Sequence, residues 1–167
     1  MTERYLTLMR HGKAAREVEG IEDFDRPLTI RGVTDAVLVA EELEARTPRV
    51  DLFLVSSARR ARITGEIVAG ILGIPSGSIL LEERIYMAEP EQLIDRLREL
   101  PPELKHVLMV GHNPGIQEAA AHLAGEDIDP LPTSGAVIFR LAVPRWSDLA
   151  PERAVMERRL APKALGR

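Results

Sequence analysis

Residues 5–12 read Tyr-Leu-Thr-Leu-Met-Arg-His-Gly, a short apolar run that ends in two polar residues and a glycine. Such a run is typical of a buried strand, and the polar residues after it indicate that the strand stops at a loop. The pattern recurs twice: residues 51–55 lead into Ser56, and residues 106–110 lead into Gly111-His112. We therefore expect three buried strands, each followed by polar side chains.

Segments with the apolar spacing of helices alternate with these strands. The expected helices are 29–46, 58–72, 90–100 and 115–124. Thr29 suits the first N-cap, and Gly73 and Gly125 suit the C-terminal ends of the second and fourth helices. Three weaker strands are expected at 79–81, 136–143 and 153–160, and residues 13–27 read as a long charged surface loop. This alternation predicts an α/β three-layer sandwich, with a mostly parallel central sheet flanked by helices.

Length and composition restrict the class of protein. A chain of 167 residues fits one domain, spanning 1–167. The absence of cysteine excludes a disulfide scaffold, a thiolate metal site and a cysteine-nucleophile phosphatase. A net charge of −4 argues against nucleic-acid binding, which relies on basic surfaces. No apolar run approaches the roughly 20 residues of a membrane span, and the N-terminus lacks a signal-peptide pattern, so a cytoplasmic location is expected.

The carboxyl ends of parallel strands meet at one edge of a sheet, where such folds bind ligands. Residues 10–12, 56–60 and 111–112 should therefore come together, bringing at least two arginines close to two histidines. Arginine charges repel a metal cation, so neither a metal nor a cofactor is expected. Guanidinium groups match phosphoryl oxygens, and a neutral imidazole is a competent nucleophile near pH 7. These residue types therefore predict phosphoryl transfer.

Three motifs at these strand ends resemble those of the histidine phosphatase superfamily, which includes the cofactor-dependent phosphoglycerate mutases. They are residues 8–12 (Leu-Met-Arg-His-Gly), 56–64 (Ser-Ser-Ala-Arg-Arg-Ala-Arg-Ile-Thr) and 110–114 (Val-Gly-His-Asn-Pro). The motifs occur in the family's order, and the resemblance runs from Tyr5 to about Leu160. It implies a phosphoglycerate mutase-like fold and a phosphatase activity without a metal.

The resemblance also implies a role for each motif residue. His11 would be the nucleophile that becomes phosphorylated. Three further side chains would hold the phosphoryl oxygens: Arg10, Arg60 and His112. Arg60 is preferred to Arg59 and Arg62 because it occupies the Arg-Ala step of the motif, and the other two are expected on a solvated helix face.

The segment after the first motif points to a subgroup. It lacks the serine and asparagine that mutases and broad-specificity acid phosphatases typically carry there. Residues 25–32 (Asp-Arg-Pro-Leu-Thr-Ile-Arg-Gly) instead resemble the short SixA-type phosphohistidine phosphatases, as do residues 132–137 and the pair Trp146 and Leu149. Those relatives act on phosphohistidine in signalling proteins such as histidine phosphotransfer domains. We therefore predict a phosphohistidine phosphatase with a phosphorylated protein as its partner.

Glu83 keeps an alternative open. It lies where mutases carry an acid-bearing motif, although a surface carboxylate in a connecting loop fits equally well. A phosphomonoester expels an alkoxide and benefits from such a general acid. The same fold could therefore serve a small phosphorylated metabolite, such as a sugar or nucleotide phosphate. A non-catalytic phosphate-binding module is an alternative of a different class, and mutase activity is disfavoured by the short chain.

Two histidines lie outside the motifs. His106 precedes a strand and reads as a structural or exposed residue. His122 follows His112 by ten residues on the next expected helix, beyond reach of the strand ends, so a metal site that joins these two carries little weight.

Overall fold

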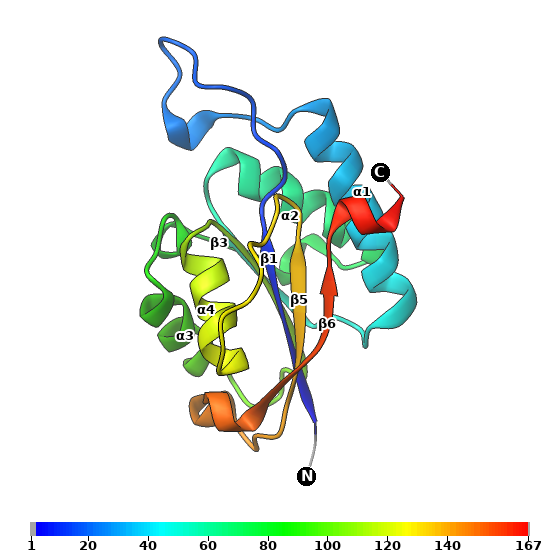
Figure 1. Cartoon of the computed structure of the whole chain (residues 1–167), viewed down its shortest axis with the longest axis vertical. Helices are drawn as coiled ribbons and strands as arrows, with labels where there is room; N and C mark the ends of the chain where they lie inside the picture. The colour runs from blue at the N-terminus through cyan, green and yellow to red at the C-terminus, as the bar shows by residue number, and fades with distance from the viewer. Residues whose placement is uncertain (1–2, 167) are drawn as a thin grey trace.

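A six-stranded sheet forms the middle layer of the protein, and the structure, a computed structural model, describes residues 3–166 (Figure 1). The strands are β1 (Arg4–Arg10), β2 (Leu52–Ser56), β3 (Ile79–Glu82), β4 (His106–Gly111), β5 (Ala136–Leu141) and β6 (Ala154–Leu160). They lie in the order β3-β2-β4-β1-β5-β6. The first four are parallel to one another, and β5 is antiparallel to both of its neighbours. The prediction of a mostly parallel sheet is confirmed.

Four α-helices cover the two faces of the sheet. They are α1 (Ile30–Arg46), α2 (Arg59–Leu72), α3 (Pro90–Arg98) and α4 (Gly115–Ala124). The apolar residues of α1 and α2 join one core cluster, and those of α3 and α4 join the other. Short 3₁₀ turns occupy Asp23–Asp25, Ser76–Ser78, Glu83–Ile85, Trp146–Asp148, Pro151–Arg153 and Pro162–Leu165. The three predicted layers are therefore present.

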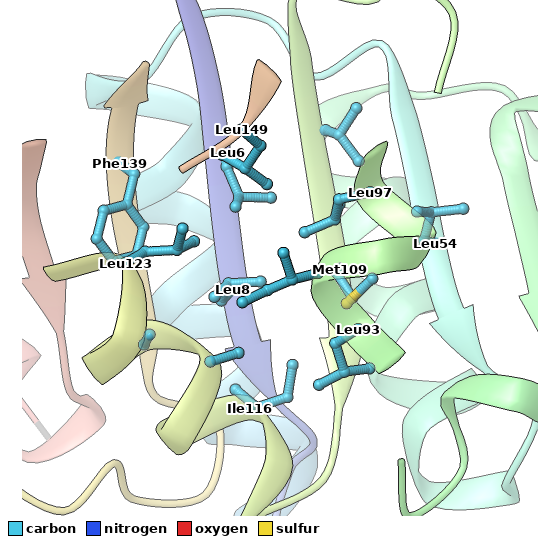
Figure 2. Packing of buried hydrophobic residues seen from close by; sticks show 14 of the residues in the cluster. Leu6, Leu8, Leu54, Leu93, Leu97, Met109, Ile116, Leu123, Phe139 and Leu149 are labelled. Atoms are coloured by element: carbon cyan, nitrogen blue, oxygen red, sulfur yellow. The ribbon is translucent and has the colours of Figure 1, made fainter. Parts of the chain in front are cut away.

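The central strands are largely apolar because both of their faces are buried. In β1, Leu6 and Leu8 point into the cluster beneath α3 and α4, whereas Met9 points into the opposite cluster. Figure 2 shows Leu8 and Met109 side by side on adjacent strands, in the same cluster as Ile116 of α4. Alternate residues of one strand thus supply both cores, which is the pattern of a parallel sheet covered by helices.

Local sequence signals set the helix ends. The Thr29 hydroxyl accepts a hydrogen bond from the Gly32 N–H and caps α1. Gly73 and Gly125 end α2 and α4 with left-handed backbone, at φ of 69° and 75°. The third predicted helix stops at Arg98 rather than residue 100, because its last turn tightens into i→i+3 hydrogen bonds. The predicted strand 136–143 likewise ends two residues early, at Leu141.

His106 is fully buried at the start of β4. Its Nε2 lies 2.8 Å from the Thr7 hydroxyl, and its Nδ1 lies 2.8 Å from the Pro48 carbonyl oxygen. Both ring nitrogens therefore have partners in the fold, so His106 is a structural residue. His122 is exposed on α4, as expected for a residue away from the strand ends.

The register of the sheet brings the three motifs together. Arg10 at the end of β1 pairs with Gly111 at the end of β4, and Val55 of β2 pairs with Val110 of β4. The loops after these three strands therefore leave the same edge of the sheet. Within residues 3–166, no helix combines the length and apolarity needed to cross a membrane.

Candidate active site

A cavity of about 290 Å³ opens where β1, β2 and β4 end. Its lining contains all four of the motif residues that the sequence singled out for phosphoryl chemistry: Arg10, His11, Arg60 and His112. Lys13 and Arg26 add positive charge, and Asp23 is the one carboxylate among the described residues of the lining. The cavity is therefore strongly basic, although the whole chain is acidic.

His11 follows directly on β1 and is 8% exposed. Its Nδ1 lies 2.7 Å from the Gly12 carbonyl oxygen, which can only accept, so Nδ1 carries the proton and donates. Burial lowers the pKa of His11 to about 4, and Arg60 and Arg10 act in the same direction. The imidazole is therefore neutral at neutral pH, with its lone pair on Nε2 facing the cavity.

Gly12 connects the first motif to the second. Its N–H donates to the Thr64 hydroxyl at 2.9 Å, and that hydroxyl donates to the Arg60 carbonyl at 2.7 Å. A Cβ at position 12 would lie 3.0 Å from the Gly32 carbonyl oxygen and 3.2 Å from the Ser134 hydroxyl. A side chain at position 12 would therefore force its neighbours to shift by a few tenths of an ångström, so glycine suits this close approach.

His112 follows directly on β4, and its ring centroid lies 5.0 Å from that of His11. Its Nδ1 faces an Arg60 amino group at 3.4 Å, and guanidinium nitrogens only donate, so Nδ1 accepts. The other nitrogen, Nε2, then donates to the Ser56 hydroxyl at 2.8 Å. Burial lowers the pKa of His112 to about 3. His112 is therefore neutral and held by the serine that opens the second motif.

Two arginines line the cavity together with the nucleophile. Arg60 is buried, and its Nε lies 3.3 Å from His11 Nε2. Arg10 donates from Nη1 to the Leu131 carbonyl at 3.1 Å, whereas its buried Nε has no protein partner within the described part of the chain. Guanidinium groups beside a nucleophile suit an oxyanion. As expected, Arg59 is exposed on α2 and Arg62 pairs with Glu66 along the helix surface.

The sequence did not single out Asp23 and Tyr86, which also belong to this site. Asp23 lies in the long loop expected at the surface, and the structure places Asp23 and Arg26 of that loop in the cavity lining. Arg60 donates to the Asp23 carboxylate at 3.0 Å, and the Tyr86 hydroxyl donates to the same oxygen at 2.5 Å. These contacts hold the pKa of Asp23 well below its usual range, the Tyr86 hydrogen bond contributing most. Asp23 is therefore ionised throughout the neutral range.

A family comparison agrees with this geometry. The family model described as the histidine phosphatase superfamily (branch 1) matches residues 6–85. A Mycobacterium tuberculosis protein described as uncharacterized is 35% identical over 158 residues, which cover 89% of this chain and 96% of that protein. The phosphohistidine phosphatase SixA of Escherichia coli is 30% identical over 131 residues, or 78% and 80% of the two chains. The chain belongs to the histidine phosphatase superfamily.

Solved structures of the superfamily extend the likeness to the whole fold. A putative phosphohistidine phosphatase SixA from Agrobacterium tumefaciens superimposes with a TM-score of 0.79 at 30% identity, covering 96% of this chain and 99% of that one. The protein histidine phosphatase SixA complexed with tungstate gives a TM-score of 0.81 at 26% identity, with coverages of 96% and 99%. This histidine phosphatase therefore has the expected fold and is a phosphatase of that superfamily.

Glu83 lies apart from the other candidate residues. The sequence placed it among the catalytic candidates, but in this histidine phosphatase its side chain is exposed and lies outside the described lining of the cavity. The 3₁₀ turn Glu83–Ile85 buries Ile85 in the core and directs Tyr86 toward the site, which leaves Glu83 in solvent. The carboxylate that the fold delivers to the cavity is Asp23 instead.

The arrangement favours binding an anion and attacking it. Basic side chains converge on one neutral imidazole, whose unprotonated Nε2 accepts a hydrogen bond from Arg60 and can form a bond to phosphorus once an oxyanion takes over that donor. Among residues 3–166, no three His, Asp or Glu side chains gather as metal ligands. The donor set therefore fits a tetrahedral oxyanion such as a phosphoryl group far better than it fits a cation.

Proposed function

We propose that this histidine phosphatase hydrolyses phosphohistidine on a partner protein through a phosphohistidine intermediate at His11. The observation that carries the proposal is the combination of a neutral nucleophile with the lack of a protonated carboxyl group. Asp23 is the one carboxylate among the described lining residues, and its contacts keep it ionised. The cavity therefore supports a reaction whose leaving group departs without a carboxylic acid.

The first step forms one N–P bond and breaks another. His11 Nε2 attacks phosphorus while the bond from phosphorus to the substrate imidazole breaks. A phosphohistidine whose other ring nitrogen is protonated leaves as a neutral imidazole, so no acid has to supply a proton. An alkoxide from a phosphomonoester leaves as an anion and takes a proton from a general acid. The described cavity thus favours the nitrogen leaving group.

The second step hydrolyses the phosphorylated His11. The Gly12 carbonyl holds the proton on His11 Nδ1, so this imidazole also departs in its neutral form. Water supplies the oxygen of the released phosphate, and its surplus proton goes to the phosphate or to solvent. Arg10, Arg60 and His112 are proposed to hold the phosphoryl oxygens, where guanidinium groups stabilise the charge of the transition state. Burial lowers the pKa of His112, and the negative charge of a bound phosphoryl dianion would raise it again. His112 would then be protonated and would donate a hydrogen bond to a phosphoryl oxygen.

The relatives support the substrate class. SixA of Escherichia coli, a phosphohistidine phosphatase by name, is 30% identical to this chain. The SixA structure with tungstate carries a tetrahedral oxyanion that stands in for phosphate. The mycobacterial glucosyl-3-phosphoglycerate phosphatase is 17% identical with a TM-score of 0.67, so it shares the fold alone. A phosphorylated signalling protein, such as a histidine phosphotransfer domain, is therefore the partner class we propose.

The test compares phosphohistidine protein, phosphoramidate and a panel of phosphomonoesters as substrates. Wild type is expected to turn over the first two, with and without chelator, and His11→Ala to lose at least about a thousandfold in kcat. His122→Ala is the matched control because His122 is exposed and lies outside the described cavity lining. Alkaline quenching followed by mass spectrometry should recover a phosphorylated peptide that contains His11.

Other outcomes separate the alternatives. Loss of activity in chelator contradicts a metal-independent mechanism. Preference for a phosphomonoester, with activity abolished by Glu83→Gln, identifies a small-molecule phosphatase. No turnover of any substrate and no phosphorylated His11 identifies a non-catalytic phosphate-binding module.

A further inference from the structure

The Asp23 carboxylate makes four hydrogen bonds, and all of them come from side chains at or beside the cavity. Oδ1 accepts from Arg26 Nε at 3.1 Å and from Arg26 Nη2 at 2.7 Å. Oδ2 accepts from the Tyr86 hydroxyl at 2.5 Å and from Arg60 Nη2 at 3.0 Å. A carboxylate has about four lone-pair positions, so those of Asp23 are all in use.

This saturation excludes two direct roles for Asp23. A group ionised throughout the neutral range, with its pKa held below the usual range by Tyr86 and the two arginines, cannot give a proton to a leaving group. A carboxylate without a free lone pair cannot accept a hydrogen bond from a departing imidazole either. Asp23 therefore acts through the side chains it already contacts.

Of the side chains that contact Asp23, Arg60 is the one that also contacts the nucleophilic nitrogen of His11. Its Nη1 donates to the Asp23 carbonyl oxygen at 2.7 Å, and its Nη2 donates to the Asp23 carboxylate. The adjoining Nε–Nη2 edge of the guanidinium points inward, with Nε 3.3 Å from His11 Nε2 and Nη2 3.4 Å from His112 Nδ1. Asp23 thus holds the Nη1–Nη2 edge of Arg60, so that the Nε–Nη2 edge faces the two histidines where the phosphoryl group would bind.

We propose that Asp23 is a positioning residue that orients Arg60 toward the phosphoryl group on His11. The inference rests on the proposed function for its substrate, and it gives a role to the charged loop of residues 13–27. Asp23 is not a catalytic residue, because it reaches the phosphoryl group only through Arg60. The free Arg60 side chain has considerable rotamer freedom, and the two contacts with Asp23 remove it before substrate arrives.

Asp23 is itself held by a second set of contacts. Arg26 donates from Nη1 to the Ala15 carbonyl at 2.8 Å, which ties the two ends of the loop together. The Phe24 ring packs edge-on against Tyr86 with centroids 5.1 Å apart, and Tyr86 packs edge-on against His112 at 5.3 Å. The loop and the Tyr86 turn therefore fix the carboxylate in place, so that it can in turn fix Arg60.

Charge and orientation make opposite contributions, and this gives the proposal a distinctive signature. A negative charge near an anion site weakens the attraction for phosphate, so removing it should not impair substrate binding. Loss of the Arg60 orientation should slow phosphoryl transfer, because a small misplacement of a catalytic group can cost about a hundredfold. Loss of Asp23 should therefore act on kcat and leave KM nearly unchanged.

The experiment measures kcat and KM for Asp23→Asn with phosphohistidine protein. We expect kcat to fall by at least about tenfold, while KM changes by less than about threefold. Asp25→Asn is the matched control, since Asp25 is an exposed carboxylate on the same 3₁₀ turn, and it should match wild type. An unchanged or increased kcat/KM overturns the proposal, because Asp23 would then merely compete with substrate for Arg60.

A double variant separates positioning from a general loss of structure. In an Arg60→Ala background, Asp23→Asn should change kcat by less than about twofold further, because the side chain that it orients is absent. A full additional loss in that background contradicts the proposal. If Asp23→Asn alone fails to fold, Tyr86→Phe removes one hydrogen bond from Asp23 while it keeps the ring, and it should lower kcat with little change in KM; an unchanged kcat counts against the proposal.

Failure of the proposed function can be distinguished from failure of this inference. A wild type inactive on phosphohistidine refutes the substrate, and the comparison is then made with the phosphomonoester that is turned over. If none is turned over, the probe is inorganic phosphate, which should shift the Arg60 Nε–H resonance in wild type. A similar shift in Asp23→Asn refutes the positioning role whatever the substrate is.

Discussion

Thr64→Val tests the connection between the first two motifs. The Thr64 hydroxyl is fully buried, accepts from the Gly12 N–H at 2.9 Å and donates to the Arg60 carbonyl at 2.7 Å. Valine has nearly the same shape, so the variant removes the hydroxyl without leaving a large cavity. The Gly12 N–H is then buried without a partner, which costs about 1–3 kcal/mol.

The expected loss is large enough to measure in a protein of this size. A decrease of about 1–3 kcal/mol in the free energy of unfolding corresponds to a Tm lower by about 2–12 °C. Urea denaturation can be followed by the fluorescence of Trp146, which is the single tryptophan of the sequence and is fully buried. Since the Gly12 carbonyl orients His11, kcat should fall as well.

Thr34→Val is the matched control. The Thr34 hydroxyl also donates to the carbonyl four residues earlier, that of Ile30 at 3.1 Å, but Thr34 lies on the exposed face of α1. Its loss should change the free energy of unfolding by less than about 0.5 kcal/mol. Equal effects of Thr64→Val and Thr34→Val would refute the reasoning, because the Gly12 contact would then contribute nothing.

Two further predictions concern stability. Burial lowers the pKa of His11 to about 4 and that of His112 to about 3, from 6.5. Between these values and pH 6.5 the unfolded chain binds protons that the folded protein does not, so the free energy of unfolding should be level above pH 7. It should fall below pH 6.5 by up to about 1.4 kcal/mol per pH unit for each histidine; urea titrations that give equal stability at about pH 7.5 and pH 5.5 contradict this. Gly115→Ala should lower the Tm, because the added Cβ would lie 2.2 Å from the Ala88 carbonyl oxygen. Gly70→Ala, with nothing within 4 Å of the added Cβ, should instead raise the free energy of unfolding by about 0.5–1 kcal/mol. Thermal melts in which Gly115→Ala has the higher Tm of the two variants contradict the close packing at Gly115.

Local patterns were sufficient for most of the fold. Buried strands read as apolar runs because both of their faces are covered, and the caps at Thr29, Gly73 and Gly125 are local hydrogen-bond and backbone effects. The convergence of the three motifs also followed from sequence, because parallel strands present their carboxyl ends at one edge. Two predicted ends differ from the structure by two residues: α3 ends at Arg98 and β5 ends at Leu141. These ends depend on how the last helical turn, or the last pair of strand residues, packs against the rest of the molecule.

Carboxylates were the part of the site that local patterns could not place. Asp23 and Asp25 lie two residues apart in the same charged loop, and no period in the sequence separates them. The fold of the loop, held by Arg26 on Ala15, brings Asp23 to Arg60 and leaves Asp25 exposed. Glu83 shows the converse, since its motif position suggested an acid but the turn that buries Ile85 directs Glu83 into solvent.

The sequence by itself determined the layered α/β fold, the absence of cysteine chemistry and the meeting of His11, Arg10, Arg60 and His112. These follow from strand and helix periodicity and from short motifs, whose physical causes lie within a few residues of the chain. Only the tertiary structure decided which carboxylate lines the cavity, which nitrogen of each imidazole carries the proton and how Arg60 is held. Those properties depend on contacts between segments about 40 to 60 residues apart, which no local pattern encodes.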